Sequence, residues 1–159
     1  MKKREILAFA KYFGASVPAG KIQNRETRMA IVMLYSSLVA PTKAIEAETE
    51  AVRKSLVEGH EDEIMKYAAL RVKAGDTNLS EEERNAAKTE ADAMTECISI
   101  DADYSEAMNR ILSEECDAPI KKVSLDVLYD ALCDCGFPLF KPEMTLAEVR
   151  TAFEQVIAE

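Results

Sequence analysis

The longest periodic pattern of apolar residues in the chain covers residues 24–57. Within it, Ile31, Leu38, Ile45 and Val52 recur at intervals of seven. Seven residues make two helical turns at about 3.5 residues per turn, so these side chains form one stripe that can pack against a partner helix. The pattern predicts a long helix. The stripe could serve self-association, or it could be buried within a single chain.

Pro41 interrupts this pattern, because proline has no backbone N–H for the helical ladder and crowds the preceding turn. Two outcomes are open: a kink within one long helix, or a break after which Pro41 begins a second helix. The stripe keeps its phase from Leu38 to Ile45, across the proline. This continuity favours the kink.

Further helices are predicted where apolar residues recur at spacings of three and four. They cover approximately residues 3–13, 61–75, 81–115, 124–135 and 145–157. Ser80 with Glu83, and Thr145 with Glu148, have the spacing of capping boxes, whose side chains satisfy free amides of a first helical turn. We expect a bend at the acidic residues 101–103, inside the helix 81–115.

These elements predict an all-α fold. Its centre is a long antiparallel hairpin of residues 24–58 and 81–116, covered by shorter N- and C-terminal helices, because two helices alone would leave apolar surface exposed on both. We expect a single helical domain over residues 1–159. Its parts are an N-terminal helix and loop (1–20), the hairpin core (22–118) and a C-terminal two-helix extension (119–159).

A loop is predicted at residues 136–144, between the last two helices. Its Phe137, Leu139 and Phe140 are too apolar to remain in water, so we expect them to be covered by the fold.

Charge is distributed unevenly along the 159 residues. The net charge is −9, yet residues 1–28 hold seven basic and two acidic groups, a balance of +5, which leaves −14 for the remainder. An acidic body argues against general binding to nucleic acid, although the basic N-terminal segment could touch it. Apolar runs are too short for a bilayer span, and Glu5 and Lys11 interrupt any secretory signal. We therefore expect a cytoplasmic protein that does not bind membranes.

Candidate chemistry is concentrated in Cys133-Asp134-Cys135. Successive residues of a helix turn by about 100°, so the two thiols point some 200° apart and cannot chelate one ion. Both follow apolar residues at helical spacing, where cysteine behaves as a small hydrophobe, and we expect core cysteines. The alternatives are a redox-active thiol pair, or a metal site completed by Cys97, Cys116 or His60 after the last turn unwinds.

No other motif has the residues that its chemistry needs. Gly20-Lys21 resembles the end of a phosphate-binding loop, but Ala15 and Ile22 replace its first glycine and its magnesium-binding hydroxyl. His60, the one histidine, lacks the glutamate three residues earlier that a helical di-iron site requires, and we expect it to lie exposed at a helix end. No catalytic residue, cofactor or small-molecule substrate is indicated.

The order of features resembles a group of small uncharacterised helical proteins encoded in the structural or tail regions of phages and prophages. The matching pieces are "NRETR" (24–28), "EAVRKSLVEGHEDEIMKYA" (50–68), "GDTN" (75–78) and "YSEAMNRILSEECDAPIKKVSLDVL" (104–128). The resemblance covers about residues 22–128 and implies a phage or prophage origin, a non-enzymatic role in virion assembly and possible association with the virion. It transfers no functional residues.

Taken together, the sequence predicts a non-enzymatic helical protein that acts in protein–protein interaction or assembly, through apolar helix faces and an acidic surface. The alternatives are a thiol-based redox sensor that uses Cys133 and Cys135, and a small DNA-associated regulator that uses residues 1–28.

Overall fold

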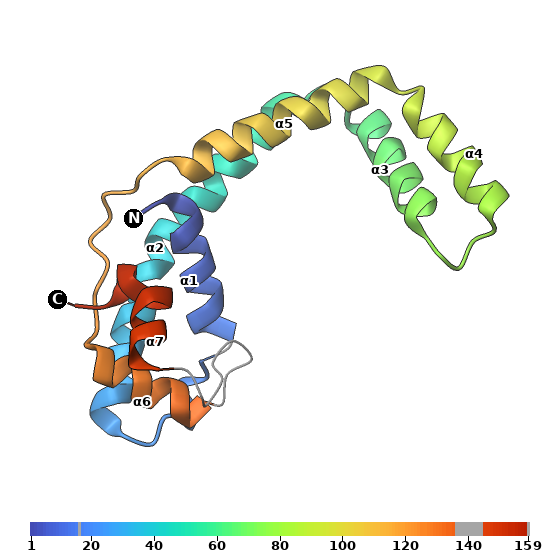
Figure 1. Ribbon diagram of the computed structural model, residues 1–159. Helices are drawn as coiled ribbons and strands as arrows, with labels where there is room; N and C mark the ends of the chain where they lie inside the picture. The colour runs from blue at the N-terminus through green and yellow to red at the C-terminus, as the bar shows by residue number, and fades with distance from the viewer. Residues whose placement is uncertain (16, 136–144, 159) are drawn as a thin grey trace. The chain divides into compact units, whose positions relative to one another are not determined.

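The computed structural model describes residues 1–15, 17–135 and 145–158, and within them the chain is all-α, with seven α-helices and no strand. The helices are α1 (Lys3–Ala15), α2 (Arg25–Val57), α3 (Glu61–Gly75), α4 (Glu81–Asp92), α5 (Thr95–Ser113), α6 (Leu125–Cys135) and α7 (Leu146–Phe153) (Figure 1). Short 3₁₀ helices, η1 (Ala19–Lys21) and η2 (Glu154–Val156), complete the set. The loop prediction at 136–144, with Phe137, Leu139 and Phe140, lies outside the described residues.

Helix α2 continues through Pro41 without a break. At its start, the side-chain oxygen of Asn24 accepts hydrogen bonds from the backbone N–H groups of Glu26 (2.8 Å) and Thr27 (3.3 Å), which is the bonding of an N-cap. At its end lies Gly59, whose φ of 85° is unfavourable for other residues. The single long helix is confirmed, and the alternative of a second helix beginning at Pro41 is wrong.

The prediction of one helix over residues 81–115 is wrong. Two helices form instead, α4 and α5, separated by a turn at Ala93 and Met94. The expected bend at residues 101–103 is also misplaced, since these residues lie inside α5. The second arm of the predicted hairpin therefore consists of two helices, and its pairing with α2 stays a prediction. Both capping boxes are confirmed, at Ser80 with Glu83 and at Thr145 with Glu148.

The described chain divides into two compact units. Unit 1 comprises Met1–Glu46 and Leu112–Glu159, and unit 2 comprises Ala47–Ile111. The N-terminal helix and the C-terminal extension thus belong to one unit, although the sequence suggested three successive parts. The expectation of a single domain stays a prediction.

The core of unit 1 is formed by α1, the first part of α2, α6, α7 and the segments that join them. Its fully buried side chains come from every one of these elements: Ile6, Ile22, Ile31, Leu34, Leu38, Leu128, Leu132, Val149 and Val156. Aromatic rings link α1 to α7, with the ring centroids of Tyr12 and Phe153 5.3 Å apart. Burial raises the pKa of the Tyr12 phenol far above its usual value, as expected for a partly buried ring that packs against this core.

An extended strap, residues 114–124, connects α5 to α6 and is tied to unit 1 by backbone hydrogen bonds. The Cys116 N–H donates to the Met1 carbonyl (2.9 Å), and the Lys121 N–H donates to the Ser37 hydroxyl on α2 (2.9 Å). Near its end, the Val123 N–H donates to the Val156 carbonyl oxygen (3.0 Å). The segment before α6 is therefore held against unit 1 at its start, its middle and its end.

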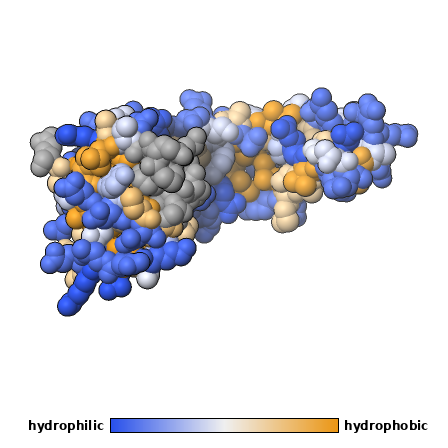
Figure 2. Space-filling model, turned by 60° about the horizontal axis from the view of Figure 1, so that its bottom comes forward, coloured by the Kyte–Doolittle hydropathy of each residue, from blue (hydrophilic) through white to orange (hydrophobic). Residues whose placement is uncertain are grey.

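Unit 2 contains its own core, in which α3 packs against α4. Tyr67 and Leu70 of α3 meet the small side chains of Ala87 and Ala91 on α4, and Cys97 of α5 completes the buried cluster. Figure 2 shows apolar surface within the part of the molecule that contains α3 and α4, surrounded by hydrophilic side chains. The small side chains of the alanines permit close approach of the two helices.

Truncation of Leu38 tests the importance of the buried side of α2. Leu38→Ala leaves a cavity in the core of unit 1, and we expect it to lower the free energy of unfolding by about 2–5 kcal/mol. Val32→Ala, on the exposed side of the same helix, should change it by less than about 0.5 kcal/mol. Urea denaturation followed by circular dichroism measures both, and equal effects would contradict the assigned core.

Two glycines at helix ends, Gly59 just after α2 and Gly75 at the end of α3, provide a matched test of the backbone conformation. Gly59→Ala introduces a Cβ at positive φ without a steric neighbour, so we expect a loss of roughly 1–2 kcal/mol of stability from the backbone conformation alone. Gly75→Ala, at negative φ and also free of neighbours, should be neutral or stabilising. Thermal unfolding of the two variants checks the difference, which an equal melting temperature would refute.

Candidate functional site

Most of the predicted packing stripe is buried within the fold of a single chain. Ile31, Leu38 and Ile45 are at most 2% exposed and belong to the core of unit 1. Val52 is half-buried and lies in unit 2. The first three residues are already buried in this core, so they are not available to a second chain without unfolding of unit 1.

The opposite side of α2 is apolar as well, yet it faces solvent. Met29, Val32 and Met33 are 56%, 41% and 51% exposed. Their spacing of three and four residues places them on one side of the helix, and the exposed Ser36 and Ala40 continue the same row. We call these five residues the outer face of α2. Large exposed apolar side chains that adjoin one another are typical of interaction sites.

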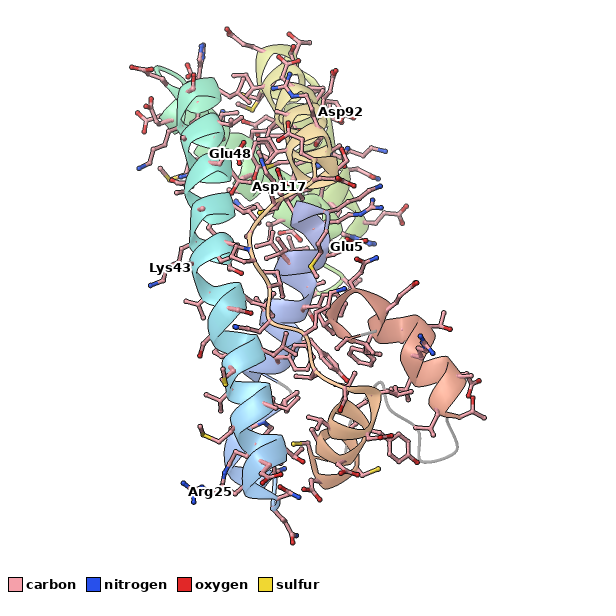
Figure 3. The ribbon with its side chains drawn as sticks, turned by 90° about the vertical axis from the view of Figure 1, so that its left-hand side faces the viewer. Glu5, Arg25, Lys43, Glu48, Asp92 and Asp117 are labelled. Carbon is pink, nitrogen blue, oxygen red and sulfur yellow. The ribbon has the colours of Figure 1, made fainter. Side chains whose placement is uncertain are left out.

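Cationic residues occupy both ends of the outer face. Arg25 precedes Met29 by four residues and Lys43 follows Ala40 by three, so both fall on the same side of the helix. Figure 3 shows these two side chains projecting from the same side of α2, away from α1 and α6. Between Arg25 and Ile45 the only acidic residue in the sequence is Glu26. The outer face is therefore apolar in its middle and positively charged at its ends.

The heptad pattern alone does not reveal the outer face, because it selects only the side of α2 that becomes the core. A signal is nevertheless present in "MAIVMLYSSLVA" (29–40), which is apolar around the whole helix. By length and composition α2 is also long and apolar enough to cross a membrane, and 22% of the apolar window that meets this criterion is buried within the structure. The expectation of a protein that does not bind membranes stays a prediction.

The Cys133-Asp134-Cys135 segment is the last turn of α6 and contacts the segment that precedes α2. The Asp134 carboxylate accepts a hydrogen bond from the Gln23 N–H (2.9 Å), and the Cys135 thiol lies 3.9 Å from the Pro18 carbonyl oxygen. Cys135 is buried, as expected for a core cysteine, whereas Cys133 is exposed, contrary to that expectation. The reason is that one helix end cannot direct both thiols into the same core, since they point in opposite directions.

Electrostatics make Cys135 a poor nucleophile. Burial raises the pKa of its thiol, the neighbouring Asp134 charge raises it further, and Lys21 only partly offsets these effects. Burial likewise raises the pKa of Cys97 in unit 2, with further contributions from Glu63 and Glu96. Reactive cysteines need the opposite environment, one that favours the thiolate.

His60 lies at the start of α3 and is partly buried, so the expectation of an exposed residue at the end of the preceding helix is wrong. Its ring nitrogens lie 3.8 Å from Glu63 and 3.6 Å from Glu96, too far for hydrogen bonds. Within the described ranges, no group of three or more His, Cys, Asp or Glu residues is arranged to hold a metal ion.

Comparison of the chain with protein-family models, with curated proteins and with solved structures finds no match in any of the three.

Thiol labelling tests the difference between the two cysteines of α6. At pH 7 we expect Cys133 to react with a maleimide in the folded protein at least tenfold faster than Cys135, whose burial and raised pKa both suppress the thiolate. Raising the pH through the pKa of Cys135, or adding urea, should reduce the difference. Peptide mapping by mass spectrometry assigns each modified cysteine, and fast native labelling of both would favour the redox alternative.

Proposed function

We propose that this protein is a non-enzymatic interaction protein, and that the outer face of α2 binds a helix of another protein. The partner helix carries apolar side chains at spacings of three and four residues, flanked by acidic residues at its ends. The observation that carries the proposal is the exposed apolar row from Met29 to Ala40 with Arg25 and Lys43 at its ends. Such a row matches the anchor spacing of helix-to-helix recognition.

The charges of the outer face favour a different protein over a second copy. A parallel pair of α2 helices in register would place Arg25 against Arg25 and Lys43 against Lys43. An antiparallel pair centred on residue 34 would place Arg25 of one copy against Lys43 of the other. Both arrangements oppose like charges at the ends, which costs affinity and specificity. An acidic-ended helix satisfies both cations at once.

The two alternative functions have weaker support. The redox alternative requires two accessible thiols, and Cys135 is buried. The DNA alternative requires a free basic N-terminal segment. Lys3 instead makes an ion pair with Glu114 (2.7 Å), and its backbone N–H donates to the Glu114 carbonyl (2.9 Å). A role in phage or prophage assembly, and a cytoplasmic location, rest on the sequence resemblance and composition alone.

A pair of designed peptides tests the proposal. Both are eighteen-residue helices with leucines at spacings of three and four, one ending in glutamates and the other in lysines. We expect the glutamate-ended peptide to bind at least tenfold more tightly than the lysine-ended peptide. Added salt should weaken the binding of the glutamate-ended peptide. Fluorescence anisotropy of the labelled peptides measures both affinities.

Two charge insertions provide the matched comparison. Met33→Asp places a carboxylate in the outer face and should abolish binding, whereas Met65→Asp alters a residue of α3 that is 67% exposed and should leave binding intact. Both variants should keep the circular dichroism of the wild type, because neither residue is buried. Equal binding of the two peptides would contradict the proposal. So would a wild-type dimer, seen by sedimentation, that Met33→Asp dissociates.

A further inference from the structure

A pocket in unit 2 is independent of the outer face of α2. It has a volume of about 400 Å³ and lies among the last turns of α2, the middle of α3 and the middle of α5. Its apolar lining comes from all three helices: Val57, Ile64, Tyr67, Ile100 and Tyr104. This size and lining are those of pockets that bind small molecules, which usually measure about 300–1,000 Å³.

The wall on α3 is held in place by the core beneath it. Tyr67 is buried in the cluster formed with Leu70, Ala87, Ala91 and Cys97, and Ile64 packs against the same cluster. The shape of this wall is therefore set by the packing of α3 on α4 and does not depend on a bound ligand.

Two arginines line the pocket, and only one of them is already neutralised. Arg53 forms two hydrogen bonds of 2.8 Å with the two carboxylate oxygens of Glu50. The guanidinium of Arg71 instead lies over the Tyr67 ring, 5.9 Å from its centroid. Among the residues that the structure describes, no carboxylate lies within ion-pair distance of Arg71. A stacked guanidinium still presents the N–H groups of its edge to an anion.

Asp101 contributes the negative charge of the lining, from α5. It also makes no ion pair within the described part of the chain. A ligand with two or more negative charges would be repelled by this carboxylate, whereas a single charge can be placed at Arg71. Apart from these two groups and Arg53, the lining is mostly apolar, which disfavours a ligand that is polar throughout.

We infer that this pocket binds a small monocarboxylate with an aliphatic or aromatic body. The carboxylate pairs with the planar edge of Arg71, and the body lies against Val57, Ile64, Tyr67, Ile100 and Tyr104. Guanidinium and carboxylate groups match in geometry and can form two parallel hydrogen bonds, which is why arginine is selective for planar anions. The apolar body supplies the remaining affinity by leaving water.

Titration of the full-length protein with octanoate tests this inference. The matched ligands are octanol and octylamine, which keep the eight-carbon body but lack the carboxylate. We expect saturable binding of octanoate, followed by calorimetry and by chemical shifts of residues in α3 and α5. Its affinity should be at least tenfold higher than those of octanol and octylamine. No saturable binding, or an amine that binds as well as the acid, would overturn the inference.

Variants of α3 distinguish the contribution of the Arg71 charge inside the pocket from the effect of any positive charge nearby on the same helix. Arg71→Gln should weaken octanoate binding at least fivefold, while Lys73→Gln, an exposed lysine on α3 that does not line the pocket, should not. Ala68→Trp, which fills the pocket from α3, should abolish binding and leave the helical content unchanged. Equal effects of Arg71→Gln and Lys73→Gln, or unchanged binding by the folded Ala68→Trp variant, would refute the assignment.

Discussion

The burial of one side of α2 is the constraint on which unit 1 depends. Helices α1, α6 and α7 share a core whose centre is formed by Ile31, Leu34 and Leu38. Full burial of each such side chain contributes about 1.5–3 kcal/mol, and the buried side chains of the shorter helices, among them Ile6, Leu128 and Val149, belong to the same cluster. The strap is fastened to the same helix through Ser37. Continuity of α2 through Pro41 is therefore essential, because a break there would divide the stripe that the other elements cover.

The same constraint explains why the outer face remains exposed. A helix in a two-layer arrangement can bury only one side, and α2 is apolar on both. The side opposite the core then requires either polar residues or a partner. Here it carries Met29, Val32 and Met33, with small residues beyond them and a cation at each end. Interaction with an acidic-ended helix is the function that this distribution of charge supports best.

Some charged groups of unit 2 form ion pairs, whereas others line the pocket without an ion-pair partner among the described residues. Arg53 with Glu50, and Lys66 with Glu90 (2.7 Å), are ion pairs on exposed helix surfaces. Their hydrogen bonds lower the pKa of Glu50 and raise that of Lys66, but such exposed pairs contribute little to stability. Arg71 and Asp101 line the same apolar pocket as Arg53, but unlike Arg53 they form no ion pair within the described residues. The proposed ligand recognition rests on these unpaired pocket charges and not on the number of charged residues in unit 2.

Local patterns in the sequence predict the helical class, the continuous helix α2 and both capping boxes, and they identify one apolar stripe along α2. These features depend on residues within one or two turns of each other, so local spacing is sufficient to predict them. Tertiary packing decided the rest. The periodicity of residues 81–115 does not reveal the turn at Ala93, nor the packing of Ala87 and Ala91 in one cluster with Tyr67 and Leu70 of α3. The different environments of Cys133 and Cys135, the exposure of Met33 and the pocket at Arg71 likewise depend on which neighbours cover each residue, and those neighbours are distant in the chain.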